Sequence, residues 1–165
     1  MIEVATLVGP AWNWPTDWNA LAHEAVLTAV RVSGQSQLED SPAAFEIAVK
    51  FADDEEVRAL NAAYRGKPTP TNVLSFPMLS AAELAQPPVQ GGLLGDIVLA
   101  AGVCEREARE KDSLVADHAC HLIVHGTLHL FGHDHGDDAA AETMEAFERS
   151  ALGRIGIADP YEARL

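Results

Sequence analysis

Residues 113–135 read SLVADHACHLIVHGTLHLFGHDH, a stretch with helical periodicity that runs to a glycine at position 132. Residues three or four apart lie on the same face of a helix, so His125 and His129 are expected to project side by side. Gly132 allows the backbone conformation that ends a helix, and the chain can then turn and bring His135 back toward the same face. The spacing therefore predicts a chelating set of three imidazoles.

The predicted set leaves one coordination position open. Catalytic zinc sites commonly have three protein ligands and a fourth position for water or substrate, whereas structural zinc sites fill all four positions with protein ligands. We therefore expect one Zn²⁺ ion, bound by His125, His129 and His135, in a site that supports catalysis.

Two further histidines precede this set on the same segment. His118 and His121 lie seven and four residues before His125, which places them on the same helical face. They either extend the site or are buried polar residues that hydrogen-bond to the backbone or to a carboxylate. Cys120 and Val124 fall on a different face, and we expect that face to be buried.

The turn after Gly132 carries His133 and Asp134, and the spacing leaves their roles open. His133 contacts either solvent or substrate. Asp134 is either a turn residue or the acceptor for the N–H of a ligand imidazole. We expect catalytic roles for both residues, and each is a candidate for the general base, as is His121.

The position after the first ligand argues against a peptidase. Zinc peptidases of the H-E-x-x-H type have a glutamate directly after the first histidine, where it serves as the general base. This chain has Gly126 at that position. The sequence has the ligands of a metal-dependent hydrolase without that built-in base.

The rest of the chain alternates between strand and helix patterns. Strands are predicted at IEVATLV, FEIAVKF, NVLSFPM and LLGDIVLA, which are residues 2–8, 45–51, 72–78 and 93–100. Helices are predicted at residues 17–33, 52–66, 102–112, 113–132 and 137–156, and the Pro- and Gly-rich residues 79–92 are predicted to form a loop. This order predicts an α/β (α+β) fold with about four strands and about five helices.

Length and composition favour a single domain over residues 1–165. Hydrophobic residues make up 48% of the chain, and no apolar run approaches the roughly 18 residues that a membrane span needs. The N-terminus lacks the basic cluster of a secretory signal, so we expect a cytoplasmic protein. Cys104 and Cys120 are too few for a disulfide framework and are expected to be small core residues.

The charge balance is strongly acidic. Eleven basic and 25 acidic side chains give a formal net charge of −14. Proteins that grip nucleic acid over a wide surface depend on many lysine and arginine contacts to phosphates, so this balance argues against such a surface. It is compatible with a small positive pocket, because a bound divalent cation adds local positive charge.

A second unusual stretch, LNAAYRGKPTPTNVLSFP, covers residues 60–77. It sets Arg65 and Lys67 in a loop with glycine, prolines and threonines. An arginine in such a loop can present its planar donor group to a phosphate. Alternatively, a basic residue at this place only interacts with the C-terminal end of the helix dipole.

Both unusual stretches resemble one protein family. HGTLHLFGHDH, residues 125–135, resembles the H-G-x-L-H-L-x-G-Y-D-H signature of the YbeY family, bacterial endoribonucleases of ribosomal RNA maturation. Residues 60–77 resemble the family motif L-N-x-x-Y-R-G-K-x-x-P-T-N-V-L-S-F-P, and LGDIVLA resembles its L-G-D-I strand. The resemblance covers most of residues 45–150.

The resemblance implies a fold, an activity and a set of partners. It implies a mixed four-stranded sheet packed with helices, zinc bound by His125, His129 and His135, and Arg65 as the catalytic arginine. The implied activity is single-strand-specific cleavage of RNA in 16S rRNA 3′-end maturation and ribosome quality control. Implied partners are ribosomal RNA and ribosomal subunits, ribosomal proteins and a ribosome-associated GTPase. We do not expect the protein to bind a membrane.

The chain departs from the family signature at one position. His133 stands where the signature has tyrosine, so a ring that stacks is replaced by a titratable imidazole, and any role of the tyrosine does not carry over.

Three other functions remain open besides the endoribonuclease. They are a ribosome-assembly factor with a structural metal and little catalysis, a zinc hydrolase of another substrate such as a peptide, and an RNA-binding module, which the net charge makes the weakest of the three.

Overall fold

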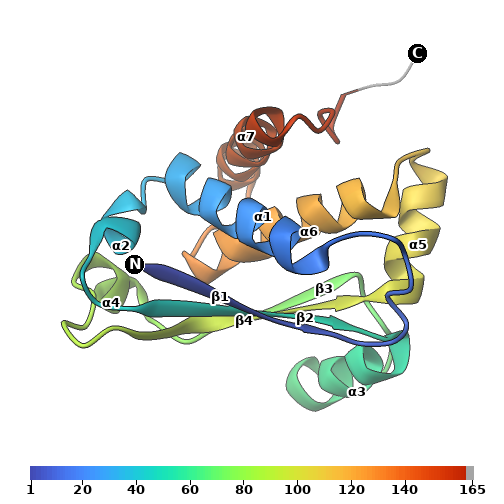
Figure 1. Ribbon diagram of the computed structural model, residues 1–165, viewed down its shortest axis with the longest axis horizontal. Helices are drawn as coiled ribbons and strands as arrows, with labels where there is room; N and C mark the ends of the chain where they lie inside the picture. Colours follow the sequence, from blue (N-terminus) through green and yellow to red (C-terminus); the bar gives the residue numbers. More distant parts are fainter. Residues whose placement is uncertain (163–165) are drawn as a thin grey trace.

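The computed structural model describes residues 1–162, which form one four-stranded sheet with helices on both faces (Figure 1). The strands are β1 (Ile2–Val8), β2 (Phe45–Ala52), β3 (Val73–Pro77) and β4 (Gly92–Ala100). Their order in the sheet is β1-β2-β4-β3, with β1, β2 and β4 parallel and β3 antiparallel to β4. The mixed four-stranded sheet is therefore confirmed, and β3 is one of its two edges.

Seven helices occur in the described part of the chain. They are α1 (Trp18–Val32), α2 (Ser36–Asp40), α3 (Asp54–Arg65), α4 (Ala81–Ala85), α5 (Ala101–Glu110), α6 (Val115–Leu130) and α7 (Asp138–Ile155). The five longer helices are the predicted ones. At three of these five, an aspartate caps the N-terminus by accepting a hydrogen bond from a backbone N–H of the first turn: Asp17, Asp53 and Asp137.

The two short helices were not predicted, and α4 corrects the loop expected at residues 79–92. Ser80 begins α4 with a capping box, in which its hydroxyl accepts from the backbone N–H of Glu83 while the Glu83 carboxylate accepts from the backbone N–H of Ser80. This reciprocal pair satisfies two backbone donors and stabilises one helical turn despite the prolines that follow. None of the helices described is long and apolar enough to span a membrane.

The main core lies between the sheet and helices α1 and α6, and α7 packs on the side of α1 and α6 that faces away from the sheet (Figure 1). Alternate residues of β2 point into this core, and Phe45, Ile47, Val49 and Phe51 are all buried there. Helix α3 lies on the opposite face of the sheet, over a smaller cluster that includes Val57. Helix α6 is almost entirely buried, so its polar residues need partners inside the protein.

Helices α6 and α3 pack on consecutive residues of the edge strand β3. A Cβ atom at Gly126 of α6 would lie 3.0 Å from Ser75 Oγ and 3.1 Å from a methyl carbon of Ile97, so the helix backbone lies close to the sheet. On the other face, the Tyr64 ring near the end of α3 packs edge-on against Phe76 at a centroid distance of 5.3 Å. The C-terminal halves of both helices are therefore positioned by the same edge strand.

Gly95 of β4 allows the end of α6 to approach the sheet, and we predict that Gly95→Ala is destabilising. The added Cβ would lie 2.5 Å from a Leu130 methyl carbon and 2.6 Å from the backbone oxygen of Phe76, which cannot move away without disturbing the β3–β4 pairing. Overpacking of this kind costs about 1–3 kcal/mol. Urea unfolding followed by tryptophan fluorescence measures the change.

Gly153→Ala is the matched control. No atom lies within 4 Å of a Cβ built at Gly153 in α7, and alanine is the better helix former there. We expect this substitution to stabilise the protein by about 0.5–1 kcal/mol. Equal unfolding midpoints for Gly95→Ala and the wild type would contradict the packing argument.

Candidate metal centre

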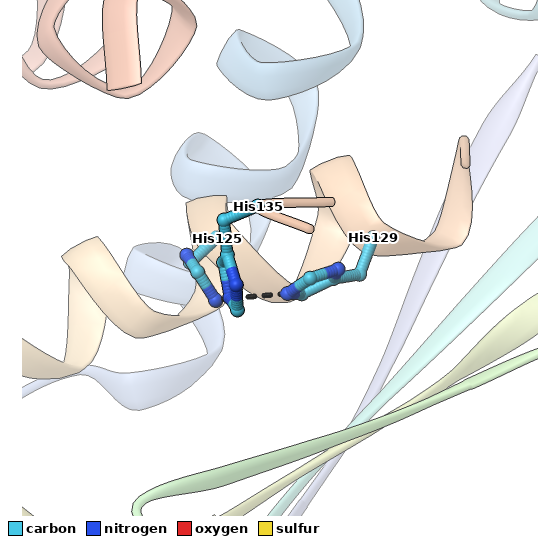
Figure 2. A group of neighbouring side chains, drawn as sticks. All are labelled: His125, His129 and His135. Carbon is cyan, nitrogen blue, oxygen red and sulfur yellow. Dashed lines mark hydrogen bonds between the residues drawn. The ribbon is translucent and has the colours of Figure 1, made fainter. Parts of the chain in front are cut away.

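Three histidines of the sequence motif converge at one point. A ring nitrogen of each of His125, His129 and His135 lies within 4.8 Å of the corresponding nitrogens of the other two. The Nε2 atoms of His125 and His129 are 2.9 Å apart, and the His135 ring lies beside both (Figure 2). The rings point toward a common centre, as they would around one ion.

The end of α6 explains how the third histidine reaches this centre. Gly132 has a positive φ of 87°, a conformation in which glycine is not strained. The backbone N–H of Gly132 donates to His129 O, and that of His133 donates to Leu128 O, so the last carbonyls of the helix are satisfied while the chain reverses. His135 then lies in the loop that follows α6, and its ring stacks beside that of His125 at a centroid distance of 5.6 Å (Figure 2).

A buried carboxylate orients the first histidine. Glu148 of α7 has no solvent exposure, and its Oε1 atom lies 2.6 Å from His125 Nδ1. Burial alone would raise the pKa of Glu148, but hydrogen bonds from His121, His125 and Tyr161 lower this pKa to about 2. Since an ionised carboxylate only accepts, His125 donates from Nδ1, and its Nε2 lone pair faces the other two histidines. This is the carboxylate–histidine arrangement that is typical of metal ligands.

The sequence interpretation missed Glu148. It lies 13 residues after His135, and only the packing of α7 against α6 brings it to the site. A signal was present nevertheless. The buried positions of α7 are Met144, Glu148, Ala151 and Leu152, so one acid interrupts an apolar stripe with helical spacing. A buried acid of this kind needs a partner.

His129 has the protonation state that a ligand needs. Burial is the main cause that lowers the pKa of the His129 imidazole to about 4, so the ring is neutral at pH 7. A hydrogen bond with the backbone of His133 engages the same side chain. Three clustered imidazoles, one of them held by a carboxylate, fit Zn²⁺ and similar borderline metal ions.

The two upstream histidines lie at hydrogen-bonding distance from carboxylates and are not part of the cluster of three. His118 is buried, and its Nε2 lies 2.8 Å from Glu107 Oε1. Burial lowers the pKa of His118 as well. His121 Nε2 lies 3.3 Å from Glu148 Oε1 and so shares that carboxylate with His125. Of the two alternatives, the structure favours buried polar residues.

The structure also places the two turn residues. The His133 ring packs edge-on against Phe147 at a centroid distance of 5.0 Å, outside the cluster of three histidines. Burial lowers the pKa of His133. Asp134 is exposed, and its Oδ1 accepts from the backbone N–H of Gly136 at 3.0 Å. Asp134 is thus a turn residue, and the carboxylate that engages a ligand imidazole is Glu148.

Arg65 is separated from the histidines by the sheet. It is the last residue of α3, on the face opposite α6, and it is exposed (Figure 1). Gly66 follows with a φ of 68° and ends the helix, and the Asn61 amide donates to Thr69 O to hold the loop. Neither Arg65 nor Lys67 has an ion pair with any residue in the range 1–162. Most other described basic side chains do: Arg31, Lys50, Arg58, Arg106, Arg109 and Arg149.

Comparisons with known proteins find the same description for a family model and for individual relatives. The sequence model of a family described as Endoribonuclease YbeY matches residues 16–156. A protein of that description from Rhizorhabdus wittichii is 51% identical over 164 residues, which is 98% of this chain and 97% of the relative. One from Sphingopyxis alaskensis is 48% identical, with 98% of each chain covered. The solution structure of TM1509 from Thermotoga maritima is similar in fold, with a TM-score of 0.55, 20% identity and coverage of 99% and 100%.

The lowered pKa of His129 predicts that the metal-free protein loses stability in mild acid. The unfolded chain takes up a proton near pH 6.5, whereas folded His129 does so only near pH 4, so protons favour unfolding as the pH falls from 6.5 toward 4. A pKa difference of one corresponds to about 1.4 kcal/mol, and partial exposure reduces the effect, so we expect a loss of about 1 kcal/mol between pH 7 and pH 5.

Urea unfolding in the presence of a chelator, at both pH values, measures this loss. His129→Asn has no group that titrates in this range at that position, so its free energy of unfolding should fall less between pH 7 and pH 5 than that of the wild type. Identical pH dependence of the two proteins would show that His129 does not contribute.

Proposed function

The chain belongs to the YbeY family of endoribonucleases, and we propose that it cleaves single-stranded RNA at a metal centre formed by His125, His129 and His135. The observation that carries this proposal is the convergence of the three imidazoles in front of a buried carboxylate. Family membership supports the reaction class, and the histidine geometry supports the place that we propose for the reaction.

The donor set favours one Zn²⁺ ion. When bound, the metal would supply Lewis-acid activation of the scissile phosphate or of an attacking water. His125 and His129 approach from adjacent turns of α6, and Glu148 fixes the ring orientation of His125. His135 is exposed, so the cluster opens to solvent on its side and the substrate can enter there.

Arg65 is proposed to neutralise charge on the phosphoryl oxygens in the transition state. Its guanidinium lacks an ion pair with the described residues and so presents its full set of donors to a phosphate. The sheet stands between α3 and α6, but both helices pack on β3, through Phe76 and Ser75 respectively. An RNA strand that crosses the outer edge of β3 would contact both sites.

The proposed substrate in the cell is ribosomal RNA. By family membership, the chain would act in the cytoplasm in 16S rRNA 3′-end maturation and ribosome quality control. The net charge of −14 makes strong binding of free RNA unfavourable, so targeting would fall to the ribosomal subunit, to ribosomal proteins or to a ribosome-associated GTPase.

Peptide hydrolysis is disfavoured by the packing of α6. The position that holds the glutamate in H-E-x-x-H enzymes is Gly126, which faces Ser75 and Ile97 of the sheet at contact distance. A longer side chain there would be directed into the core.

His133 and Asp134 retain proposed catalytic roles besides Arg65. Asp134 is proposed because its carboxylate is exposed and it directly precedes His135 in the sequence.

We predict that His129→Ala and Arg65→Ala both abolish most RNA cleavage, for separable reasons. His129→Ala removes a ligand and should weaken zinc binding by more than the roughly 10- to 100-fold that loss of an outer hydrogen bond costs. Arg65→Ala should retain zinc and lower kcat by about 10²- to 10³-fold, as removal of one transition-state donor does. Cleavage of a labelled single-stranded RNA and zinc content are measured together.

Arg154→Ala is the control for Arg65→Ala, since Arg154 is an exposed arginine of α7. It should cleave like the wild type. Equal activity in all four preparations would indicate a contaminating nuclease and sink the proposal. Zinc retention with no cleavage in the wild type would instead favour an assembly factor with a structural metal. A 2′,3′-cyclic phosphate product would assign attack to the RNA 2′-hydroxyl.

The scarcity of available cations predicts a shallow salt dependence of RNA binding. Each phosphate neutralised on a single strand contributes about −0.7 to the slope of log K against log salt, so contacts from Arg65 and Lys67 give a slope of about −1.4. Lys67→Gln should reduce the slope by about 0.7. Fluorescence anisotropy across a salt series measures both, and a slope steeper than about −4 would contradict the prediction.

A further inference from the structure

The C-terminal segment folds back along α7 and brings Tyr161 to the metal centre. The Tyr161 hydroxyl donates to Oε2 of Glu148, and it also lies 3.5 Å from His121 Nε2. Tyr161 is 26 residues from His135 in the sequence, and none of the sequence motifs includes it. It therefore joins the site only through the fold of the chain after α7.

Several contacts fix this segment. Gly156 ends α7 with a φ of 90°, and the backbone N–H of Ile157 donates to Leu152 O at 2.9 Å. Asp159 accepts from Arg149 Nε at 3.1 Å and from the backbone N–H of Tyr161 at 2.8 Å. The Arg149 guanidinium also lies 5.3 Å from the centre of the Tyr161 ring. Arg149 thus holds the turn at Asp159 and the ring of Tyr161 against α7.

The two oxygens of Glu148 have separate donors. Oε1 faces His121 and His125 of α6, whereas Oε2 receives the Tyr161 hydroxyl. Among the described residues 1–162, the donor that contacts Oε2 of Glu148 is the Tyr161 hydroxyl. A carboxylate with no solvent exposure needs donors on both oxygens, because an unpaired oxygen of a buried charge carries a large desolvation penalty.

We propose that Tyr161 is a positioning residue of the metal centre, which acts through Glu148 on His125. Its hydroxyl holds the carboxylate in the orientation in which Oε1 accepts a hydrogen bond from the Nδ1–H of His125, and this directs the Nε2 lone pair of His125 to the metal. The inference rests on the proposed metal binding by the three histidines. It adds that metal affinity depends on the docking of the C-terminal segment.

Tyr161→Phe tests this inference because it removes the hydroxyl and keeps the ring that packs against Arg149. We expect zinc affinity, measured by competition with a chromogenic chelator, to fall by about 10-fold, at the lower end of the range for an outer-sphere partner. The visible spectrum of the Co²⁺-loaded protein should shift as well, since it reports the geometry of the ligands. Tyr64→Phe changes the other tyrosine of the chain, on the far face of the sheet, and should leave zinc affinity unchanged.

A double-mutant cycle with Glu148→Gln separates positioning from general packing. If Tyr161 acts through the Glu148 carboxylate, Tyr161→Phe should cost much less affinity in the Glu148→Gln background than in the wild type. Equal losses in both backgrounds would assign Tyr161 a purely structural role and overturn the inference. Arg149→Gln keeps the side chains of Glu148 and Tyr161 but loosens the turn at Asp159. It should also weaken zinc binding, by a smaller factor than Tyr161→Phe.

The outcomes distinguish this inference from the function on which it rests. Tight zinc binding by the wild type and undiminished binding by Tyr161→Phe would overturn the role of Tyr161 alone. A correctly folded wild-type protein that binds no zinc at pH 7 would overturn the metal centre and the inference with it. Weaker binding by Tyr161→Phe with normal binding by Tyr64→Phe supports both.

Discussion

The hydrogen bonds around the Glu148 carboxylate tie together the parts of the protein that form the metal centre. An ionised group without solvent exposure is tolerated only where donors surround it, and the donors here come from α6 and from the segment after α7. Displacement of either element would leave one oxygen of the buried carboxylate without its donor. The orientation of His125, the first of the proposed ligands, therefore depends on the packing of the core around Glu148.

The sequence predicts those features of the fold that local patterns determine. The alternation in FEIAVKF gives β2 its buried face, and the glycine at position 132 gives the turn that returns His135 to the cluster. At residues 79–92, two local signals conflict. The prolines and glycines favour a loop, and the Ser80–Glu83 capping box favours a helical turn, which forms before the first proline is reached.

The candidate site was predictable only where its parts are close in sequence. His125, His129 and His135 are related by one helix and one turn, so their spacing is enough to bring them together. Glu148 and Tyr161 join them through contacts between α6, α7 and the C-terminal segment, which no local pattern encodes. Asp134 was the nearer acid in sequence, but the turn that returns His135 uses its carboxylate for the N–H of Gly136.

The close packing of α6 on the sheet also limits the chemistry of the site. One face of the helix carries His125 and His129, two of the three proposed ligands, and Gly126, directly after His125, faces Ser75 and Ile97. A residue adjacent to a ligand is the one that peptidases of the H-E-x-x-H type use as general base, and here that position has no room for a carboxylate. Two other polar groups of α6 are also buried and hydrogen-bonded: Thr127 donates to Ile123 O, and His121 lies against Glu148. For the proposed RNA cleavage, the candidate sources of proton transfer outside α6 are the turn that carries His133 and Asp134 and the substrate itself.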